Sequence, residues 1–160
     1  MTQPMQAIEG LWIAQVMRES LWLYPTVETL HLWGVGALFG SILLVDLRLL
    51  GLGRGLELRP LLRFAVPVTI SGFALAGATG LLMFIAHPSE FIASTLFVLK
   101  MTLLMLLGLN AISLHLRIGP IADPSGRVPV DIALSMRLQA AVSVLGWAVV
   151  IGLGRWLAYV

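Results

Sequence analysis

The sequence predicts an all-α integral membrane protein, a single transmembrane domain over residues 1–160 built as a bundle of four helices. Three observations predict this fold class. Hydrophobic residues make up 59% of the chain and charged residues 11%, which leaves too little polar surface for a water-soluble globule. Four apolar stretches are each long enough to cross a hydrocarbon core of roughly 30 Å, which takes about 20 helical residues. Most arginines gather in two of the segments between those stretches.

The first twenty residues predict a short amphipathic helix that lies along the membrane interface and precedes the bundle. They have neither a basic start nor a small-residue cleavage site, so we expect them to stay in the mature protein. Most of the charged side chains lie on one side of this helix. The apolar side chains recur at helical spacing on the other side: Ile8, Leu11, Trp12 and Val16.

The four membrane spans follow at about 25–50, 61–86, 89–116 and 130–159, each predicted from the length of its apolar run. The loops after the first and third spans hold Gly, Pro and most of the arginines, which is typical of chain outside the membrane. A tight turn over His87, Pro88, Ser89 and Glu90 is expected to join the second span to the third.

Charge placement predicts the orientation of these spans. Seven arginines fall on one side: Arg48, Arg54, Arg59, Arg63, Arg117, Arg127 and Arg137. Two fall on the other: Arg18 and Arg155. The positive-inside rule therefore places both long loops in the cytoplasm and both termini outside. Aromatic rings gather at the outer ends, at the headgroup level that they prefer: Trp22, Tyr24, Phe84, Phe91, Trp156 and Tyr159.

Small residues and a few polar residues predict how the helices pack and where they end. Small residues on the first two spans are spaced to let backbones approach closely: Gly36, Gly40, Gly72, Ala76 and Gly80. Asp46 and Arg48 at the inner boundary are interpreted as topology anchors, and Asn110 as an interhelical hydrogen-bonding residue.

The residue types present exclude several classes of function. The chain has no cysteine, so any metal must bind His, Met, Lys or carboxylate ligands, and cysteine nucleophiles are excluded. No nucleotide loop, hydrolytic triad or paired-carboxylate site is visible, and the sequence predicts no enzyme class. The basic residues indicate topology and not nucleic-acid binding.

His31 is the first candidate site residue, because an ionisable side chain within a membrane span is costly unless it is paired or functional. It should lie about 9 Å below the outer boundary. An imidazole in a helix bundle is an ordinary axial ligand of b-type haem, and Gly34 and Gly36 would leave room for a flat macrocycle. The alternative is a histidine hydrogen-bonded to Glu28, Thr29 or a neighbouring helix.

Lys100 is the second candidate, since it has no acidic neighbour on its own span. It should lie about 16 Å below the outer boundary, and its long stem lets the ammonium reach the level of His31. Candidate partners are Glu28, a haem propionate, a quinone oxygen or a substrate carboxylate. The alternative is a lysine that only extends to the interface.

Two further histidines are weighed as metal ligands. His87 at the outer rim is either solvated or part of a soft metal site with Met83, one turn away. His115 lies roughly 22 Å below Lys100, near Asp46, and is either a second haem ligand or an interfacial residue.

Two stretches, LYPTVETLHLWGVGALFGSILLVDLRLLG and FVLKMTLLMLLGLNAISLH, carry a family resemblance. Their motifs are T-x-H-x-x-G (Thr29, His31, Gly34), D-L-R (Asp46, Arg48) and K-x9-N-x4-H (Lys100, Asn110, His115). They resemble an uncharacterised family of bacterial four-helix membrane proteins related to the CopD copper-resistance membrane domain and, more remotely, to HemJ-type protoporphyrinogen oxidases. The resemblance implies a multi-pass protein of the bacterial inner membrane, an outward-facing site near His31 and Lys100, and a link to haem or to copper.

Together these features predict a b-type haem protein that transfers electrons between quinone and a periplasmic partner, or within a respiratory assembly. His31 is the expected axial ligand, Lys100 the partner of a propionate or quinone or the sixth ligand, and His115 the ligand of a second site. One alternative is a cofactor-free structural subunit of a larger complex. The other is a copper-handling protein that uses His31, His87, Met83 and Met101.

Overall fold

The computed structural model describes residues 3–53, 55–121, 134–157 and 159. The described residues form seven helices: α1 (Gln3–Glu9), α2 (Trp12–Glu19), α3 (Leu23–Leu50), α4 (Leu58–Ala86), α5 (Pro88–Ala93), α6 (Thr95–Ile121) and α7 (Leu134–Trp156). Four of them, α3, α4, α6 and α7, are long and apolar enough to cross a membrane. The all-α class and the four spans are therefore confirmed.

The observed span boundaries differ from the expected ones by a few residues. Helix α4 begins at Leu58, earlier than predicted, because Pro60 lies in the first turn, where a missing backbone N–H costs no helical hydrogen bond. Helix α7 begins at Leu134, and residues 130–133 of the predicted fourth span lie outside the described residues. Arg54 and Arg127 lie outside them too.

The junction between the second and third spans was predicted wrongly as a tight turn. Pro88 opens a short helix, α5, since its fixed φ suits the first helical position. The chain then breaks at Ser94, whose extended backbone (φ −81°, ψ 118°) separates α5 from α6. The third span therefore begins at Thr95 and not at residue 89.

The N-terminal segment forms two short helices where one was expected. Helix α2 buries Ala14 and Met17 against the bundle, where it packs on α4 and α3, and leaves Trp12 76% exposed. Its amphipathic character is confirmed, and its buried face packs on protein at one end of the bundle. Placement of the exposed face in a membrane interface stays a prediction.

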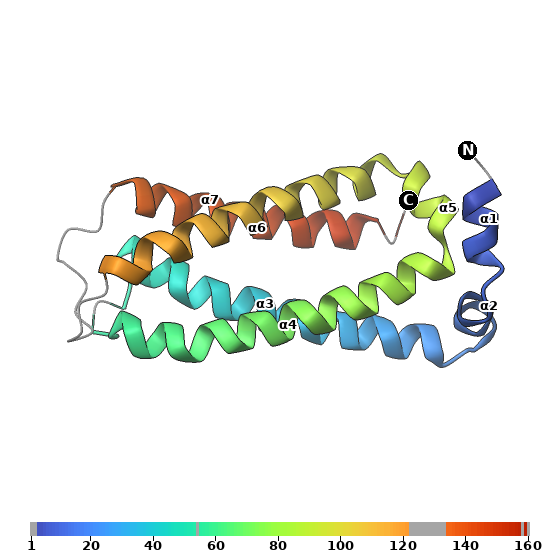
Figure 1. The fold of residues 1–160 in the computed structure, drawn as a ribbon, viewed down its shortest axis with the longest axis horizontal. Helices are drawn as coiled ribbons and strands as arrows, with labels where there is room; N and C mark the ends of the chain where they lie inside the picture. The colour runs from blue at the N-terminus through green and yellow to red at the C-terminus, as the bar shows by residue number, and fades with distance from the viewer. Residues whose placement is uncertain (1–2, 54, 122–133, 158, 160) are drawn as a thin grey trace.

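The four long helices are arranged as two pairs (Figure 1). Helix α3 packs along α4 and also contacts α7, and α6 packs against α7. Within the described residues the backbones of α4 and α6 do not pack closely, and these helices meet through side chains, as where Phe84 stacks on Phe97 with ring centroids 5.7 Å apart. Helices α1, α2 and α5 lie at one end of the bundle, with the start of α3 and the end of α7; we call this the outer end, following the predicted orientation.

Glycines set the close contact between α3 and α4. A Cβ atom at Gly34 would lie 2.6 Å from the backbone nitrogen of Ala76, and one at Gly72 would lie 2.6 Å from that of Leu38. Gly36 and Gly40 have nothing within 4 Å of a Cβ position, so their predicted packing role is wrong. Two residues advance a helix by more than half a turn, and Gly34 therefore faces α4 while Gly36 faces away.

Three apolar clusters hold the bundle together along its length. The inner cluster contains Leu49, Leu58, Leu114, Ile118, Met136 and Ala140. The central cluster contains Leu38, Leu107, Trp147 and Val150, and the outer cluster contains Met17, Val27 and Ala86. Many large apolar side chains on the four spans remain exposed, as expected of helices whose surroundings are lipid.

Candidate functional site

His31 is held by the backbone of the neighbouring helix α4. Its Nδ1 lies 2.9 Å from the carbonyl oxygen of Ala76 and 3.1 Å from the hydroxyl of Thr79. A carbonyl only accepts hydrogen bonds, so Nδ1 carries the proton and donates. The lone pair of Nε2 is then free, which is how a histidine is commonly oriented for ligation. The hydrogen-bond partner of His31 is therefore on the neighbouring helix. The hydroxyl of Thr29 donates instead to the carbonyl oxygen of Pro25 in its own helix.

The ring of His31 lies against the bare backbone of Gly80, where an added Cβ would be 3.2 Å from imidazole Cε1. Gly80 therefore makes space for the imidazole on α4. The space expected at Gly34 for a macrocycle is taken by the backbone of α4, and that part of the expectation is wrong. Gly36 is open, with nothing within 4 Å of its Cβ position.

Lys100 is half-buried on α6, and its side chain extends towards α7. Its Nζ lies 3.1 Å from the Cβ position of Gly154, so the ammonium rests on another stretch of bare backbone. In the described part of the chain this ammonium makes no hydrogen bond or ion pair. An unpaired cation within a span is costly, which favours an anionic or electron-rich partner from outside the chain.

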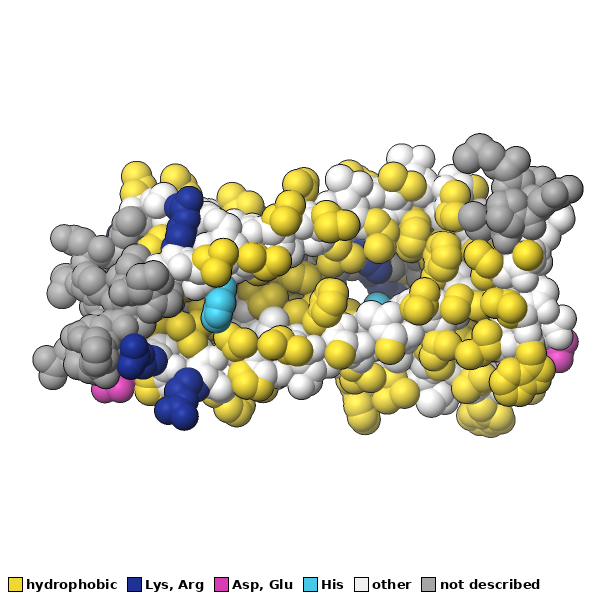
Figure 2. Space-filling view, in the orientation of Figure 1, with side chains coloured by type: hydrophobic (Ala, Val, Ile, Leu, Met, Phe, Trp, Pro, Cys, Tyr) yellow, Lys and Arg dark blue, Asp and Glu magenta, His cyan; other side chains and the backbone are white. Residues whose placement is uncertain are grey.

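The structure places His31 against Gly80 on α4 and Lys100 against Gly154 on α7. Lys100 and Glu28 are charged groups that act electrostatically on the imidazole of His31. Figure 2 shows a hollow on the face between the two helix pairs, with a histidine side chain and a basic side chain inside it. We call the residues around these two side chains the outer site: His31, Ala76, Thr79, Gly80, Lys100 and Gly154.

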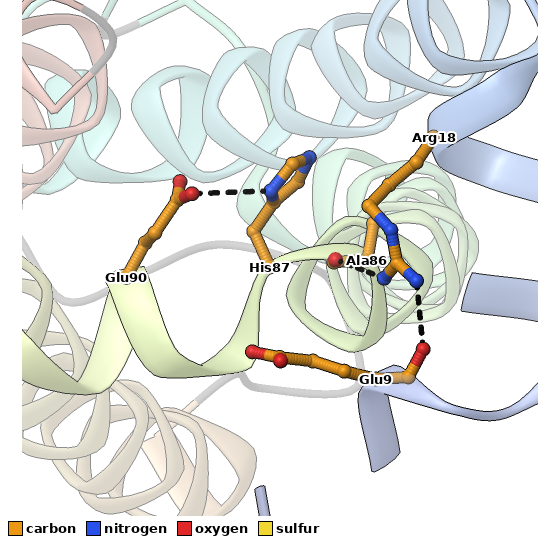
Figure 3. Close-up of polar contacts among 5 residues, drawn as sticks. All are labelled: Glu9, Arg18, Ala86, His87 and Glu90. Carbon is orange, nitrogen blue, oxygen red and sulfur yellow. Dashed lines mark hydrogen bonds and ion pairs between the residues drawn. The ribbon is translucent and has the colours of Figure 1, made fainter. Parts of the chain in front are cut away.

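His87 lies apart from the outer site, at the junction of α4 and α5. Its Nδ1 is 3.5 Å from Oε1 of Glu90, one turn along α5 (Figure 3), and its ring meets Tyr24 edge-on at 5.9 Å between ring centroids. These contacts are the kind that hold a helix junction. Met83, the expected soft partner of His87, packs against the outer apolar cluster.

Arg18 ties the same junction to the N-terminal helices. Its guanidinium donates to the carbonyl oxygen of Ala86 at 2.8 Å and to that of Glu9 at 2.7 Å (Figure 3). These carbonyls lie at the C-terminal ends of α4 and α1, where a helix lacks internal donors and a cation is favoured. Arg18 thus has a structural role, whereas the sequence indicated only that it lies on the outer side.

His115 lies near the other end of α6 and is exposed. Asp46, which the sequence placed near His115, is buried and accepts a hydrogen bond from Ser143. Met101, named for a copper site, is 49% exposed. No group of three or more His, Asp or Glu side chains suited to a metal ion occurs among the described residues. A copper site that uses two histidines and two methionines stays a prediction.

Sequence reasoning missed the residues that orient the two candidates. Ala76 contributes a backbone carbonyl, which carries no residue-type signal. Gly154 contributes bare surface at the outer end of α7. Thr79 was detectable in principle, because a threonine inside an apolar span either bonds back to its own helix or serves a polar neighbour, and here it does both.

Comparisons with protein-family models, with curated proteins and with solved structures found no match. The resemblance to CopD-type and HemJ-type membrane proteins therefore stays a prediction. The structure supports a coarser statement, that the chain is an integral membrane protein with four helical spans in contact with the lipid bilayer.

Proposed function

We propose that this protein is a b-type haem protein of the bacterial inner membrane that transfers electrons, with Nε2 of His31 as an axial ligand. The observation that carries the proposal is the hydrogen bond from Nδ1 of His31 to the carbonyl of Ala76. A ligating histidine almost always donates its other N–H in this way, which fixes the ring and raises its basicity. The bound haem would supply reversible one-electron chemistry.

Lys100 supports the proposal through its charge. Its ammonium stands within electrostatic range of His31 and has no partner in the described part of the chain. A propionate, a quinone oxygen or a vacant axial position would each match a compact ammonium or amine at this depth. Gly80 and Gly154 give the two side chains room, and the hollow between the helix pairs is open on the face shown in Figure 2.

The predicted orientation gives the side of the membrane on which the outer site would exchange electrons. Both long loops face the cytoplasm by the positive-inside rule, so His31 and Lys100 lie in the outer half of the membrane. Quinone dissolved in the bilayer, or a periplasmic or membrane redox subunit, would then exchange electrons with the site. His115 remains the proposed ligand of a second, inner site, since it lies too far along α6 to share one cofactor with His31.

The absorption spectrum of the purified protein tests this function. We expect a Soret band and, after reduction, an α band typical of b-type haem. A colourless protein without bound metal would instead support the cofactor-free structural subunit. A colourless protein with copper would support the copper-handling alternative, which no observation of the described residues favours.

A further inference from the structure

A buried polar cluster lies in the inner half of the bundle, away from the outer site. Asp46 on α3 is 2% exposed, and its carboxylate accepts a hydrogen bond from Ser143 on α7, which is 4% exposed. The second carboxylate oxygen, Oδ2, is buried and has no hydrogen-bond partner. A buried acceptor without a donor is costly, and a charged one especially so.

Gln139 adds a second buried acceptor on the same face of α7, one turn before Ser143. Its side-chain nitrogen donates to Ser113 at 3.2 Å, and its backbone carbonyl accepts from Asn110 at 3.1 Å. These bonds to α6 fix the amide, yet its Oε1 is buried without a partner. Oε1 of Gln139 is thus a second unmatched oxygen, one helical turn from Ser143.

Charge points to the kind of ligand that would complete the cluster. No ion pair to Asp46 occurs among the described residues. The basic side chains nearest in sequence on the packed helices do not supply one: Arg48 donates to the carbonyl of Leu56, and Nε of Arg137 is buried without a partner. A carboxylate inside a span requires compensation, and intramembrane carboxylates commonly mark ion sites.

The oxygen donors select the chemical class. Carboxylate, hydroxyl and amide oxygens are hard ligands, which favour hard cations over soft ones. One carboxylate neutralises one positive charge, whereas a divalent ion would leave an uncompensated charge in a low-dielectric interior.

We propose that Asp46, Ser143 and Gln139 form a binding site for a small monovalent cation in the inner half of the membrane domain. Asp46 supplies the charge, and the Ser143 hydroxyl and the Gln139 amide supply neutral oxygens. The site is independent of the proposed haem function, since it shares no residue with the outer site. Binding would join α3 to α7 and stabilise the bundle.

Sodium is the probe for this proposal. Thermal unfolding of the purified protein is measured in sodium chloride and in choline chloride at equal ionic strength. We expect sodium to raise Tm in a saturable way, by about 3 to 6 °C at ten times its Kd. Binding of radioactive sodium should saturate at one ion per chain. Equal Tm values in the two salts, with no saturable sodium binding, would overturn the proposal.

Two buried serines provide a matched pair of variants. Ser143→Ala should raise the sodium concentration at half-effect roughly tenfold or more. Ser41→Ala should leave it unchanged, because Ser41 is similarly buried but bonds Ala37, Leu38 and Thr69 instead. Asp46→Asn should abolish the sodium effect. If Asp46→Asn does not fold, the two serine variants decide; an equal response in both, or a Tm that follows pH and not sodium, would contradict the site.

Discussion

The imidazole of His31 and the ammonium of Lys100 both rest on helix backbone. His31 bonds the carbonyl of Ala76 and lies on Gly80, and Lys100 lies on Gly154. Neither of these two polar groups forms an ion pair with an acidic side chain among the described residues. The absence of a built-in counterion leaves the charge of Lys100 available to a ligand.

A first prediction at this scale concerns the charge of Lys100. Lys100→Met should insert normally, because it removes a charge from a span, but it should lower the haem reduction potential, because a nearby cation favours the reduced form. Lys100→Arg should not restore the wild-type potential, since a planar guanidinium does not replace a compact ammonium. Spectroscopic redox titration measures both variants. Wild-type potentials in both would show that Lys100 only anchors the helix at its depth.

Helices α3 and α4 pack most closely where glycines meet backbone. The Cβ position of Gly34 is 2.6 Å from the nitrogen of Ala76, a distance that no real Cβ occupies without movement of the helix. His31 lies one turn before Gly34 on the same face of α3, so this contact also sets the distance over which His31 reaches α4. Packing of these two helices and geometry of the site are therefore linked.

A second prediction tests that link. Gly34→Ala should destabilise the bundle by about 1–3 kcal/mol through overpacking, and should also weaken ligation by His31. Gly36→Ala is the matched control on the same helix, with nothing within 4 Å of its Cβ position, and should be neutral or slightly stabilising. Tm and haem content of the two variants provide the comparison. A Gly34→Ala protein as stable as the Gly36→Ala protein would contradict the close contact.

The difference between Gly34 and Gly36 shows what the sequence can predict. Apolar length predicts the four spans, because the bilayer imposes it on each helix separately. Which face of a helix meets a neighbour depends on how that helix is rotated about its axis. This rotation is set by the neighbouring helices and cannot be read from one span alone. For the same reason the bond from His31 to Ala76 and the approach of Lys100 to Gly154 became visible only in the folded bundle.

At the scale of the whole molecule, two helix pairs are joined closely through α3 and α7 and pack less closely between α4 and α6, where Figure 2 shows a hollow. The short helices α1, α2 and α5 lie across the outer end. The described arginines divide between the two ends as expected, and those in the helix ends next to the long loops lie opposite α2: Arg48, Arg59, Arg63, Arg117 and Arg137. The outer site thus opens sideways towards lipid, which suits a ligand or electron carrier that dissolves in the bilayer.

A third prediction concerns orientation. A reporter fused after Gly126, in a segment that lies outside the described residues, should read cytoplasmic, and one fused at the C-terminus should read periplasmic. The reason is the excess of arginines in the two long loops. Alkaline phosphatase and fluorescent-protein fusions report the two sides. The reverse pattern at either position would place the outer site in the cytoplasmic half.

The haem content of His31→Ala tests the central claim most directly. Insertion depends on apolar length and not on one imidazole, so the variant should reach the membrane in normal amount. His87→Ala is the control, because His87 is occupied by Glu90 and Tyr24 at the helix junction. We expect wild-type and His87→Ala proteins to carry haem and His31→Ala to lose it or to show an altered spectrum. Equal haem content and identical spectra in all three proteins would contradict the assignment of His31 as the axial ligand.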